Sequence, residues 1–538
     1  MNFANTLLNI ILRIKMIFVR RFVWKGLIDQ TQNPKAEQEK LLARILRKNE
    51  NTVFGKEHGF SGIASYEDYK NAVSINSYEN LRPYIEKQEQ EKEPYLNMTQ
   101  PAMYAITSGT MGKSKHIPIL KESISQYRYS QHCVAYAAYE SIPGVYDGKV
   151  LAIVSPSVEG YLDTGTPFGS MSGLIYQSMP RIISHKYVVP SEVFEIDDYD
   201  LKYKVISAFA LSEKDVTLIA TANPSTLLRI SNVINGHLDE LLIQVERGNR
   251  YGLNPNPIRA MELKSIAAEN EKITFADLWP SLKSVTTWTA GNCAVLIPSL
   301  KNLLNDSTKI VEMGYLSSEF RGSITVDPTN NKSIPTIHEN FFEFVECDAW
   351  ENEEPEFLTV DALIYGKKYY VIVATDSGLY RYFINDIVEV DGQYNGTPTI
   401  RFVQKGKGVT NLTGEKLYES QVTEAVQNLK EDLDLDFDFY MMLACPNTLQ
   451  YSIYMEVEPV PRTVKVLEYH LSNINIEFDS KRKSRRLKET SIVFVKDGTA
   501  EAYKKYCVDQ GQREGQFKLV NLQYVNECKF DFCQYERK

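Results

Sequence analysis

The chain reads Thr-Ser-Gly-Thr-Met-Gly-Lys-Ser-Lys from Thr107 to Lys115, between two apolar segments. Hydroxyls such as those of Ser108 and Thr110 offer hydrogen bonds, and Gly109 lets the backbone turn its N–H groups outward. The lysines add positive charge. Such a loop can surround a polyphosphate, which makes nucleotide chemistry the first hypothesis for this sequence.

This loop differs from a Walker P-loop. Gly112, Lys113 and Ser114 supply the ending of that motif, but Thr107 stands where its first glycine belongs. Pro118 falls where the helix of a P-loop should continue, and proline removes a helical N–H donor. The sequence therefore favours a strand, a loop and a second strand. Taken alone, the loop is equally consistent with an ordinary turn.

Composition limits the classes of function. A chain of 538 residues with 43% hydrophobic residues predicts two or more globular domains. The net charge of −9 argues against a nucleic-acid binder, since such proteins need a basic face. The seven cysteines are scattered and form no Cys-x-x-Cys pair. They favour a reducing compartment, the cytoplasm, and no zinc site.

The N-terminal segment from Met1 to Leu27 is largely apolar, with five basic residues and no acidic one. These cations interrupt every apolar run before it reaches the roughly 20 residues that cross a bilayer. They also follow the first apolar stretch, whereas a signal peptide places its charge before it. We expect an amphipathic helix that packs on its own domain, and we prefer this interpretation to a peripheral membrane anchor.

The pattern along the chain predicts an α/β fold. Strand-like runs at Val150–Val154, Val216–Ala220 and Ser284–Trp288 alternate with helical stretches such as Pro224–Val245. A β-rich subdomain follows from Ser323 to Phe402. We expect a large N-terminal domain over residues 1–404, a hinge over 405–408 with the sequence Lys-Gly-Lys-Gly, and a smaller, mobile α+β domain over 409–538.

Two later segments carry polar side chains where apolar stretches end. In the first, Tyr315 offers a ring face to a purine, Ser318 a hydroxyl to phosphate, and Glu319 a hard oxygen ligand to Mg²⁺. In the second, Asp386 could accept two O–H bonds from a ribose. Each segment alone is also explained by a strand that ends in a turn or by a surface hairpin.

A further segment, Gly-Glu-Lys-Leu-Tyr-Glu from Gly414 to Glu419, comes just after the expected hinge. Its lysine, Lys416, could meet a phosphate only if the two domains close. The segments Thr-Ser-Gly-Thr-Met-Gly-Lys-Ser-Lys, Tyr-Leu-Ser-Ser-Glu, Gly-Leu-Tyr-Arg-Tyr-x-x-x-Asp and Gly-Glu-Lys-x-x-Glu, in this order, resemble the signature set of the auxin-responsive acyl-acid amido synthetases. The likeness covers about residues 100–420. The segment from Gly515 to Lys518 is also similar to a lysine-containing segment near the C-terminus of that family.

The resemblance implies an adenylate-forming enzyme, a bacterial relative of the plant hormone-conjugating enzymes, that uses ATP and Mg²⁺. It implies nucleotide contacts from Ser108, Gly109, Thr110, Gly291, Tyr315, Ser318 and Asp386, a Mg²⁺ ligand in Glu319, and catalytic lysines in Lys416 and Lys518. The sequence departs from the plant pattern at Ala290, at Leu316 and at the pair Val520-Asn521.

The implied reaction joins a small carboxylic acid to an amine, with an amino acid as the expected acceptor, through an acyl-adenylate. One alternative is a carboxylate–CoA ligase with the same first step, in which the basic run Lys481–Arg486 would bind CoA phosphates; a solvated basic face explains that run better. An alternative of another class is a non-catalytic nucleotide-binding or membrane-surface scaffold. For the acyl pocket, the sequence suggests the space between the helix after Leu120 and the segment Thr166–Met171.

Overall fold

The computed structural model describes residues 3–107, 115–177, 179, 181–351, 354–406, 408–410, 412, 415, 417–483, 487–510 and 517–537. The chain forms two compact units. The N-terminal unit holds residues 1–106, 115–384 and 388–402. The C-terminal unit holds residues 403–538 together with the short stretches 107–114 and 385–387.

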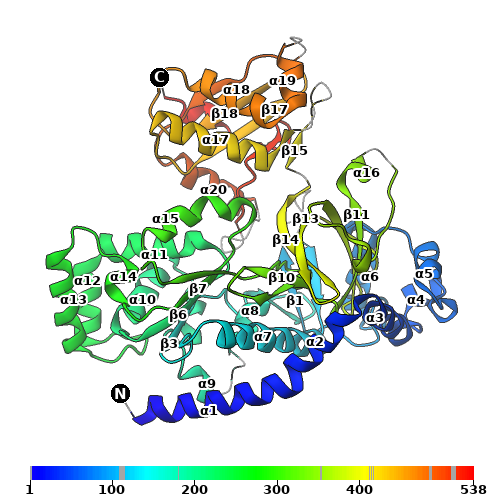
Figure 1. Ribbon diagram of the computed structural model, residues 1–538, viewed down its shortest axis with the longest axis horizontal. Helices are drawn as coiled ribbons and strands as arrows, with labels where there is room; N and C mark the ends of the chain where they lie inside the picture. The colour runs from blue at the N-terminus through cyan, green and yellow to red at the C-terminus, as the bar shows by residue number, and fades with distance from the viewer. Residues whose placement is uncertain are drawn as a thin grey trace. The chain divides into compact units, whose positions relative to one another are not determined.

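A parallel sheet lies at the centre of the first half of the chain. Its strands follow the order β3-β6-β7-β8, with bounds β3 (Lys149–Ala152), β6 (Val216–Ala220), β7 (Ser284–Thr287) and β8 (Lys309–Glu312). Helices connect the successive strands: α8 (Met171–Gln177), α9 (Arg181–Ser184), α10 (Tyr199–Ser212), α11 (Pro224–Gly236), α12 (Leu238–Arg247), α13 (Pro257–Glu269), α14 (Phe275–Leu278) and α15 (Ile297–Lys301). Because parallel neighbours need such crossovers, the alternation confirms the predicted α/β architecture (Figure 1).

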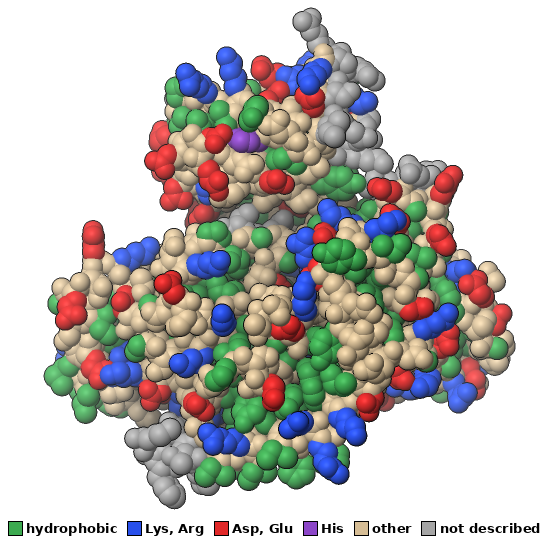
Figure 2. Space-filling view, in the orientation of Figure 1, with side chains coloured by type: hydrophobic (Ala, Val, Ile, Leu, Met, Phe, Trp, Pro, Cys, Tyr) green, Lys and Arg blue, Asp and Glu red, His purple; other side chains and the backbone are tan. Residues whose placement is uncertain are grey.

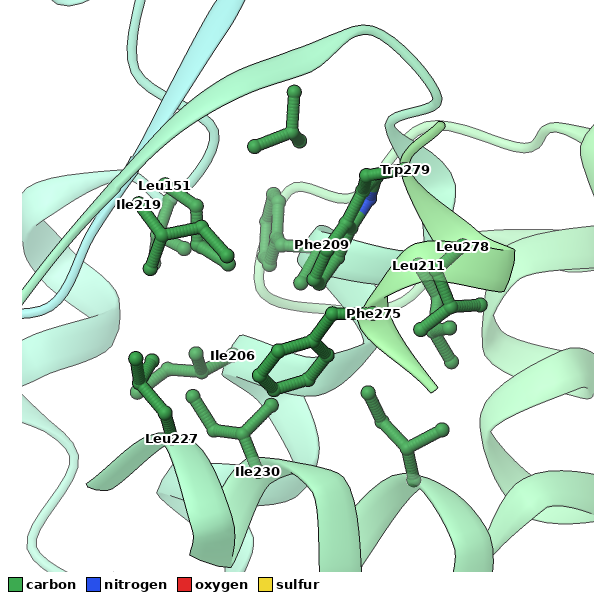
Figure 3. Packing of buried hydrophobic residues seen from close by; sticks show 14 of the residues in the cluster. Leu151, Ile206, Phe209, Leu211, Ile219, Leu227, Ile230, Phe275, Leu278 and Trp279 are labelled. Atoms are coloured by element: carbon green, nitrogen blue, oxygen red, sulfur yellow. The ribbon is translucent and has the colours of Figure 1, made fainter. Parts of the chain in front are cut away.

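The main hydrophobic core fills the space between this sheet and its helices. Figure 3 shows Leu151 and Ile219 from the sheet facing Phe209 on α10, with Phe275 and Trp279 beside them. Trp279 is fully buried, and its indole Nε1 donates to the carbonyl oxygen of Glu213 at 2.9 Å. The large side chain therefore enters the core without an unsatisfied donor.

Among the described residues, the N-terminal unit contains three further sheets, two of them in its β-rich part. The largest has the order β11-β12-β13-β14, formed by β11 (Asn340–Glu346), β12 (Lys368–Thr375), β13 (Tyr382–Tyr394) and β14 (Thr397–Lys405). The hairpin of β9 (Ser323–Asp327) and β10 (Lys332–Pro335) precedes it. The fourth sheet has the order β2-β1-β5-β4, formed by β1 (Met103–Thr107), β2 (Lys115–Ile119), β4 (Gly160–Tyr161) and β5 (Pro167–Phe168). β1 and β2 flank residues 108–114, which confirms the predicted strands on either side of the loop.

Helices fill the N-terminal region. An almost continuous helical rod begins the chain: α1 (Phe3–Val19), the π-helical turn Arg20–Trp24 and α2 (Lys25–Gln32). It is followed by α3 (Pro34–Asn49), α4 (Val53–Glu57), α5 (Tyr66–Ala72), α6 (Tyr78–Glu91) and, after β2, α7 (Lys121–Ser141). Asn33 ends the rod and caps α3, because its side chain accepts the N–H of Ala36 while Pro34 occupies the first helical position. The predicted N-terminal helix is confirmed.

The C-terminal unit contains one mixed sheet with the order β19-β18-β17-β20 and a short β15-β16 pair. Its elements are β15 (Val409–Thr410), β16 (Leu417–Tyr418), α17 (Glu419–Leu433), β17 (Tyr440–Cys445), β18 (Gln450–Met455), α18 (Thr463–Ile474), α19 (Ile476–Lys483), β19 (Ser491–Phe494), α20 (Thr499–Asp509) and β20 (Leu522–Tyr524). β17 and β18 are antiparallel, and both outer strands run parallel to their neighbours. This arrangement is the α+β topology that the sequence predicts for this part of the chain.

One helix differs from the sequence-based expectation. The helix expected over Pro224–Val245 is two helices, α11 and α12, because the backbone leaves helical geometry at His237. Lys405, expected to begin a hinge, is the last residue of β14, and Lys407 lies outside the described residues. None of the seven cysteines, all of which are described, is in a disulfide bond. Over the part of the chain that the structure describes, we find no helix whose length and apolar character would suffice to cross a membrane.

Candidate active site

Two loops of the candidate site leave the carboxyl ends of neighbouring parallel strands. β7 continues into Trp288–Gly291, and β8 continues into Met313–Glu319. In open α/β sheets, ligands bind outside the carboxyl ends of the strands. The fold therefore brings Gly291, Tyr315, Ser318 and Glu319 to one edge of the parallel sheet.

The carboxylate of Glu312 fixes both loops. Its Oε2 accepts the backbone N–H of Thr289 at 2.8 Å and the Thr289 hydroxyl at 2.5 Å, while its Oε1 accepts the N–H of Gly314 at 3.0 Å. Trp288 Nε1 adds a bond to the carbonyl oxygen of Gly314 at 3.2 Å. Gly291 has a φ of 59°, which favours glycine at this position. No sequence pattern indicated this role for Glu312, since Thr289 comes near it only through the fold.

The hydroxyl pair Ser317-Ser318 divides into two roles. Ser317 closes a tight turn: its N–H and its hydroxyl both donate to the carbonyl oxygen of Phe320, at 3.0 and 3.1 Å, and its hydroxyl accepts the N–H of Phe320 at 3.2 Å. Ser318 and Glu319 are the two central residues of that turn, and both are half-buried. The turn therefore presents the predicted phosphate donor and the predicted Mg²⁺ ligand side by side.

The ring of Tyr315 lies in the core next to this turn and is 6% exposed. Phe402 stacks on it with a centroid distance of 5.7 Å, and Phe320 meets its edge at 5.6 Å. Gly322 approaches so closely that a Cβ there would overlap the ring. Protein atoms thus already cover part of this ring, and its contact with adenine stays a prediction.

A hydrogen-bonded chain joins three of the sequence motifs. Lys115 Nζ donates to the hydroxyl of Tyr382 at 3.3 Å, and that hydroxyl donates to Glu319 Oε1 at 3.4 Å. Lys115 ends the Thr-Ser-Gly loop, Glu319 ends Tyr-Leu-Ser-Ser-Glu, and Tyr382 belongs to Gly-Leu-Tyr-Arg-Tyr. A cation, a phenol and a carboxylate therefore converge from segments far apart in sequence. Lys115 and Tyr382 were absent from the predicted site residues, although both stand within the quoted motifs.

Tyr78 positions Lys115 from the other side. Its hydroxyl accepts the N–H of His116 at 2.6 Å and donates to the carbonyl oxygen of His116 at 3.1 Å. Burial raises the pKa of Tyr78 to about 12, so the phenol keeps its proton at neutral pH. Lys115 Nζ lies 5.7 Å from the ring centroid of Tyr78 and 5.9 Å from that of Tyr382. The ammonium group is thereby held between two aromatic rings.

Most of the Gly-Leu-Tyr-Arg-Tyr segment is structural. Arg381 is buried and binds the Glu343 carboxylate through Nε at 3.0 and 3.1 Å, and its Nη1 donates to the carbonyl oxygen of Val73 at 2.8 Å. The Tyr380 hydroxyl donates to the carbonyl oxygen of Leu96 at 2.8 Å. Asp386, the predicted ribose ligand, lies four residues after Tyr382 in β13 and is 1% exposed. The structure describes its position, and its ribose contact stays a prediction.

In the C-terminal unit, two buried glutamates form hydrogen bonds close in sequence to the predicted lysines. Glu415 Oε1 accepts the N–H of Leu412 at 2.7 Å and the hydroxyl of Tyr451 at 2.8 Å. Glu419 Oε1 accepts the N–H of Asn521 at 2.6 Å. The side chain of Lys518 is exposed.

Four predicted site residues, Ser108, Gly109, Thr110 and Lys416, lie outside the described residues. Among the residues with described positions, no group of three or more His, Cys, Asp or Glu side chains could hold a metal ion. A single carboxylate is nevertheless a fitting Mg²⁺ ligand in this setting, because protein-bound Mg²⁺ commonly takes one or two carboxylates together with substrate phosphates and water. Glu319, half-buried at the tip of a turn, fits that requirement.

The two segments suggested for the acyl pocket pack on the same core. Ile124 on α7 and the residues Phe168 and Met171 are all partly buried against the cluster that contains Tyr104 and Tyr315. Arg321 lies over the ring of Tyr127 at 5.0 Å. Both segments thus contact one hydrophobic cluster, and the acyl pocket between them stays a prediction.

Solved structures identify the architecture. The chain resembles a GH3.15 acyl acid amido synthetase with a TM-score of 0.83 and 22% sequence identity, over 96% of both chains. It also resembles a 2-hydroxyisobutyryl-CoA ligase in the postadenylation state with a TM-score of 0.53 and 10% identity, over 93% of this chain and 92% of the other. The fold is therefore that of the adenylate-forming enzymes.

Family models then cover most of the sequence: the GH3 family N-terminal domain at residues 24–310, the central domain at 333–405 and the C-terminal domain at 420–524. The chain belongs to the GH3 family, which confirms the family recognised from the four motifs. Two relatives from Arabidopsis thaliana are each 24% identical. One is a probable indole-3-acetic acid-amido synthetase, aligned over 91% of this chain and 89% of its own, and the other is a 4-substituted benzoates-glutamate ligase, aligned over 92% and 94%.

Proposed function

We propose that this chain is an ATP-dependent acyl-acid amido synthetase that activates a small carboxylic acid as an acyl-adenylate and transfers the acyl group to the amine of an amino acid. The observation that carries the proposal is the chain Lys115–Tyr382–Glu319, which joins three of the four motifs at the edge of the N-terminal unit's sheets. Family membership and the amide-forming activities in the names of the relatives support it.

In the first step, a carboxylate oxygen of the acid attacks the α-phosphorus of ATP, and the bond to the β-phosphate oxygen breaks to release pyrophosphate. The two reactants are both anionic, so the site must reduce their repulsion and hold them in line. Lys115 supplies a fixed positive charge for this purpose. Mg²⁺ bound by Glu319 would neutralise phosphate charge and act as a Lewis acid.

In the second step, the amine nitrogen attacks the carbonyl carbon of the acyl-adenylate, the C–O bond to AMP breaks, and the amine loses a proton. The product is an N-acyl amino acid. The mixed anhydride must be kept from water during this step, and closure of a domain can provide that exclusion. We therefore assign the hinge to residues 405–408, between a domain of residues 1–404 and a mobile domain of residues 409–538.

The remaining roles follow the motif assignments. Ser108, Gly109, Thr110 and Ser318 bind phosphate, Gly291 and Tyr315 line the adenine pocket, and Asp386 binds the ribose. Lys416 and Lys518 act on the reacting phosphate in different closed states. The lack of a disulfide bond among the seven cysteines supports a reducing compartment, the cytoplasm.

Thioester formation is the closest competing activity, and the basic run from Lys481 is the feature that would favour it. Arg482 Nε, however, is 2.6 Å from Glu468 Oε2, and Lys483 Nζ is 2.6 Å from Asp479 Oδ2. These two cations are thus already paired within the C-terminal unit. This pairing supports the amide over the CoA thioester.

The test incubates the purified protein with ATP, Mg²⁺ and a library of carboxylic acids and amino acids, and identifies the products by mass spectrometry. We expect AMP, pyrophosphate and an N-acyl amino acid, and loss of all three when Mg²⁺ is removed with a chelator. ADP as the main product would contradict adenylation. With coenzyme A also present, accumulation of acyl-CoA without amide would overturn the acceptor and leave the first step intact.

A further inference from the structure

The N-terminal rod has two apolar faces, and only one of them packs on the protein. Met16 and Val19 are buried with Tyr136 of α7, and Leu12 and Val23 pack against the same cluster. Asn9 further anchors α1, because its Nδ2 donates to the carbonyl oxygen of Asp147 at 3.1 Å. This face confirms the expectation that the helix packs on its own domain.

The opposite face of the rod is also apolar, and it faces solvent. Five large side chains there, each 50–66% exposed, are Ile10, Ile14, Ile17, Phe18 and Phe22. Their spacing places them along one side of a helix. Phe18 and Phe22 stack on each other with a centroid distance of 6.0 Å. A row of this kind is the usual mark of an interaction surface, whereas single exposed apolar residues are common on any protein.

The exposed cations on and beside this face indicate which kind of partner it binds. Arg13, Arg20, Arg21 and Lys25 are exposed among and beside the five apolar side chains. The chain contains no acidic residue before Asp29, although its overall net charge is −9. Figure 2 shows hydrophobic and basic side chains together along the lower edge of the view, where α1 runs in Figure 1.

We infer that this exposed face of residues 10–25 binds an anionic lipid surface. An amphipathic helix that mixes exposed aromatic and aliphatic residues with cations lies in the plane of a membrane interface. Each Lys or Arg near an anionic leaflet contributes about 1 kcal/mol, which is about fivefold in affinity. A second copy of this chain matches less well, because symmetric contact through the face would bring like charges together. A nucleic acid would match the cations and leave the apolar row unburied.

The test uses the full-length protein and vesicles of phosphatidylcholine, either pure or mixed with phosphatidylglycerol, in a flotation assay. We expect binding to the mixed vesicles, weak binding to the pure ones, and a decrease with added salt. Arg13→Gln/Arg20→Gln/Arg21→Gln and, separately, Ile14→Ser/Ile17→Ser/Phe18→Ser should each reduce the bound fraction about tenfold or more.

The matched control is Ile258→Ser/Met261→Ser on α13, which removes two equally exposed apolar side chains from another surface and should leave vesicle binding unchanged. Thermal unfolding of all variants checks that each remains folded. Absence of wild-type binding to the mixed vesicles, or equal binding by both helix variants and the control, would overturn the inference. So would a wild-type dimer in light scattering that the Ile14/Ile17/Phe18 variant dissociates, or retention on duplex DNA in place of vesicles.

Discussion

The backbone N–H of Asn521 donates to Glu419 Oε1 at 2.6 Å, and this bond joins the segment after Lys518 to the start of α17. Glu419 stands three residues after Lys416, and Asn521 stands three residues after Lys518. Glu419 also lies against Gly408, whose carbonyl oxygen accepts the Glu419 N–H at 2.6 Å. One buried carboxylate therefore connects the two chain segments that carry the proposed catalytic lysines.

The first prediction concerns this carboxylate. Glu419→Ala leaves the N–H of Asn521 without its charged acceptor, and we expect the free energy of unfolding to fall by about 1.5–3 kcal/mol. Adenylation and acyl transfer should slow together, since both lysine segments lose a common support. Glu424→Ala, at an exposed position on the same helix, is the control and should change stability by no more than about 0.5 kcal/mol. Unchanged rates of both half-reactions in a folded Glu419→Ala protein would rule this role out.

Removing the Tyr382 hydroxyl, which links Lys115 and Glu319, tests the N-terminal site. Tyr382→Phe should lower kcat/KM for ATP-dependent pyrophosphate exchange about tenfold, equivalent to about 1.4 kcal/mol, because one hydrogen-bonded bridge between two charged groups is lost. The substitution keeps the ring, so the melting temperature should change little. Tyr394→Phe in the same strand is the matched control. An exchange rate equal to that of the control would make the bridge purely structural.

Asp386 gives a binding prediction. Asp386→Asn keeps the shape of the side chain and removes the charge that would accept the ribose hydroxyls. We expect ATP affinity to fall by about 1.5–3 kcal/mol for each such bond, measured by titration calorimetry. Asp391→Asn in the same strand serves as the comparison, because Asp391 binds Lys332 at 3.1 Å and has no proposed nucleotide contact. Equal affinities for the two variants would exclude the ribose role.

The proposed hinge predicts an asymmetry between the lysines. A few residues can absorb the dihedral change of a domain rotation, so Lys416 and Lys518 can serve different states. Lys416→Ala and Lys518→Ala should therefore affect adenylate formation and acyl transfer unequally in single-turnover measurements. Identical losses in both half-reactions for both variants would count against two states.

The buried pair Arg381–Glu343 gives a stability prediction. Arg381→Met leaves an uncompensated carboxylate in the core and should cost about 3–5 kcal/mol. The double variant Arg381→Met/Glu343→Leu should recover part of this loss, because it removes both charges. Denaturant unfolding of the two variants and the wild type gives the coupling energy. A double variant less stable than Arg381→Met would show that the charge is not the cause.

Periodicity and motif order were sufficient to predict the α/β body, the β-rich segment, the strands flanking residues 108–114 and the family. Those features depend on local patterns that repeat along the chain. The partners of Glu312 and Arg381 could not be predicted in this way. Glu312 binds Thr289, and Arg381 binds Glu343, so each contact depends on how distant segments meet in the fold. Sequence alone also could not tell that Ser317 closes a turn while Ser318 occupies its tip.

The segment from Asp376 to Asp386 contains residues that stabilise the fold and residues that we propose to act in the reaction. A Cβ at Gly378 would overlap Asn97 and Leu96, Tyr380 bonds to Leu96, and Arg381 neutralises Glu343. In a mutational survey scored by growth or product, substitutions at these three positions would register as inactive because the protein fails to accumulate. On the roles proposed for Tyr382 and Asp386, the conservative changes Tyr382→Phe and Asp386→Asn would register as inactive in protein that is present at normal abundance. Abundance and activity therefore have to be read out in parallel before any position in this stretch is assigned to chemistry.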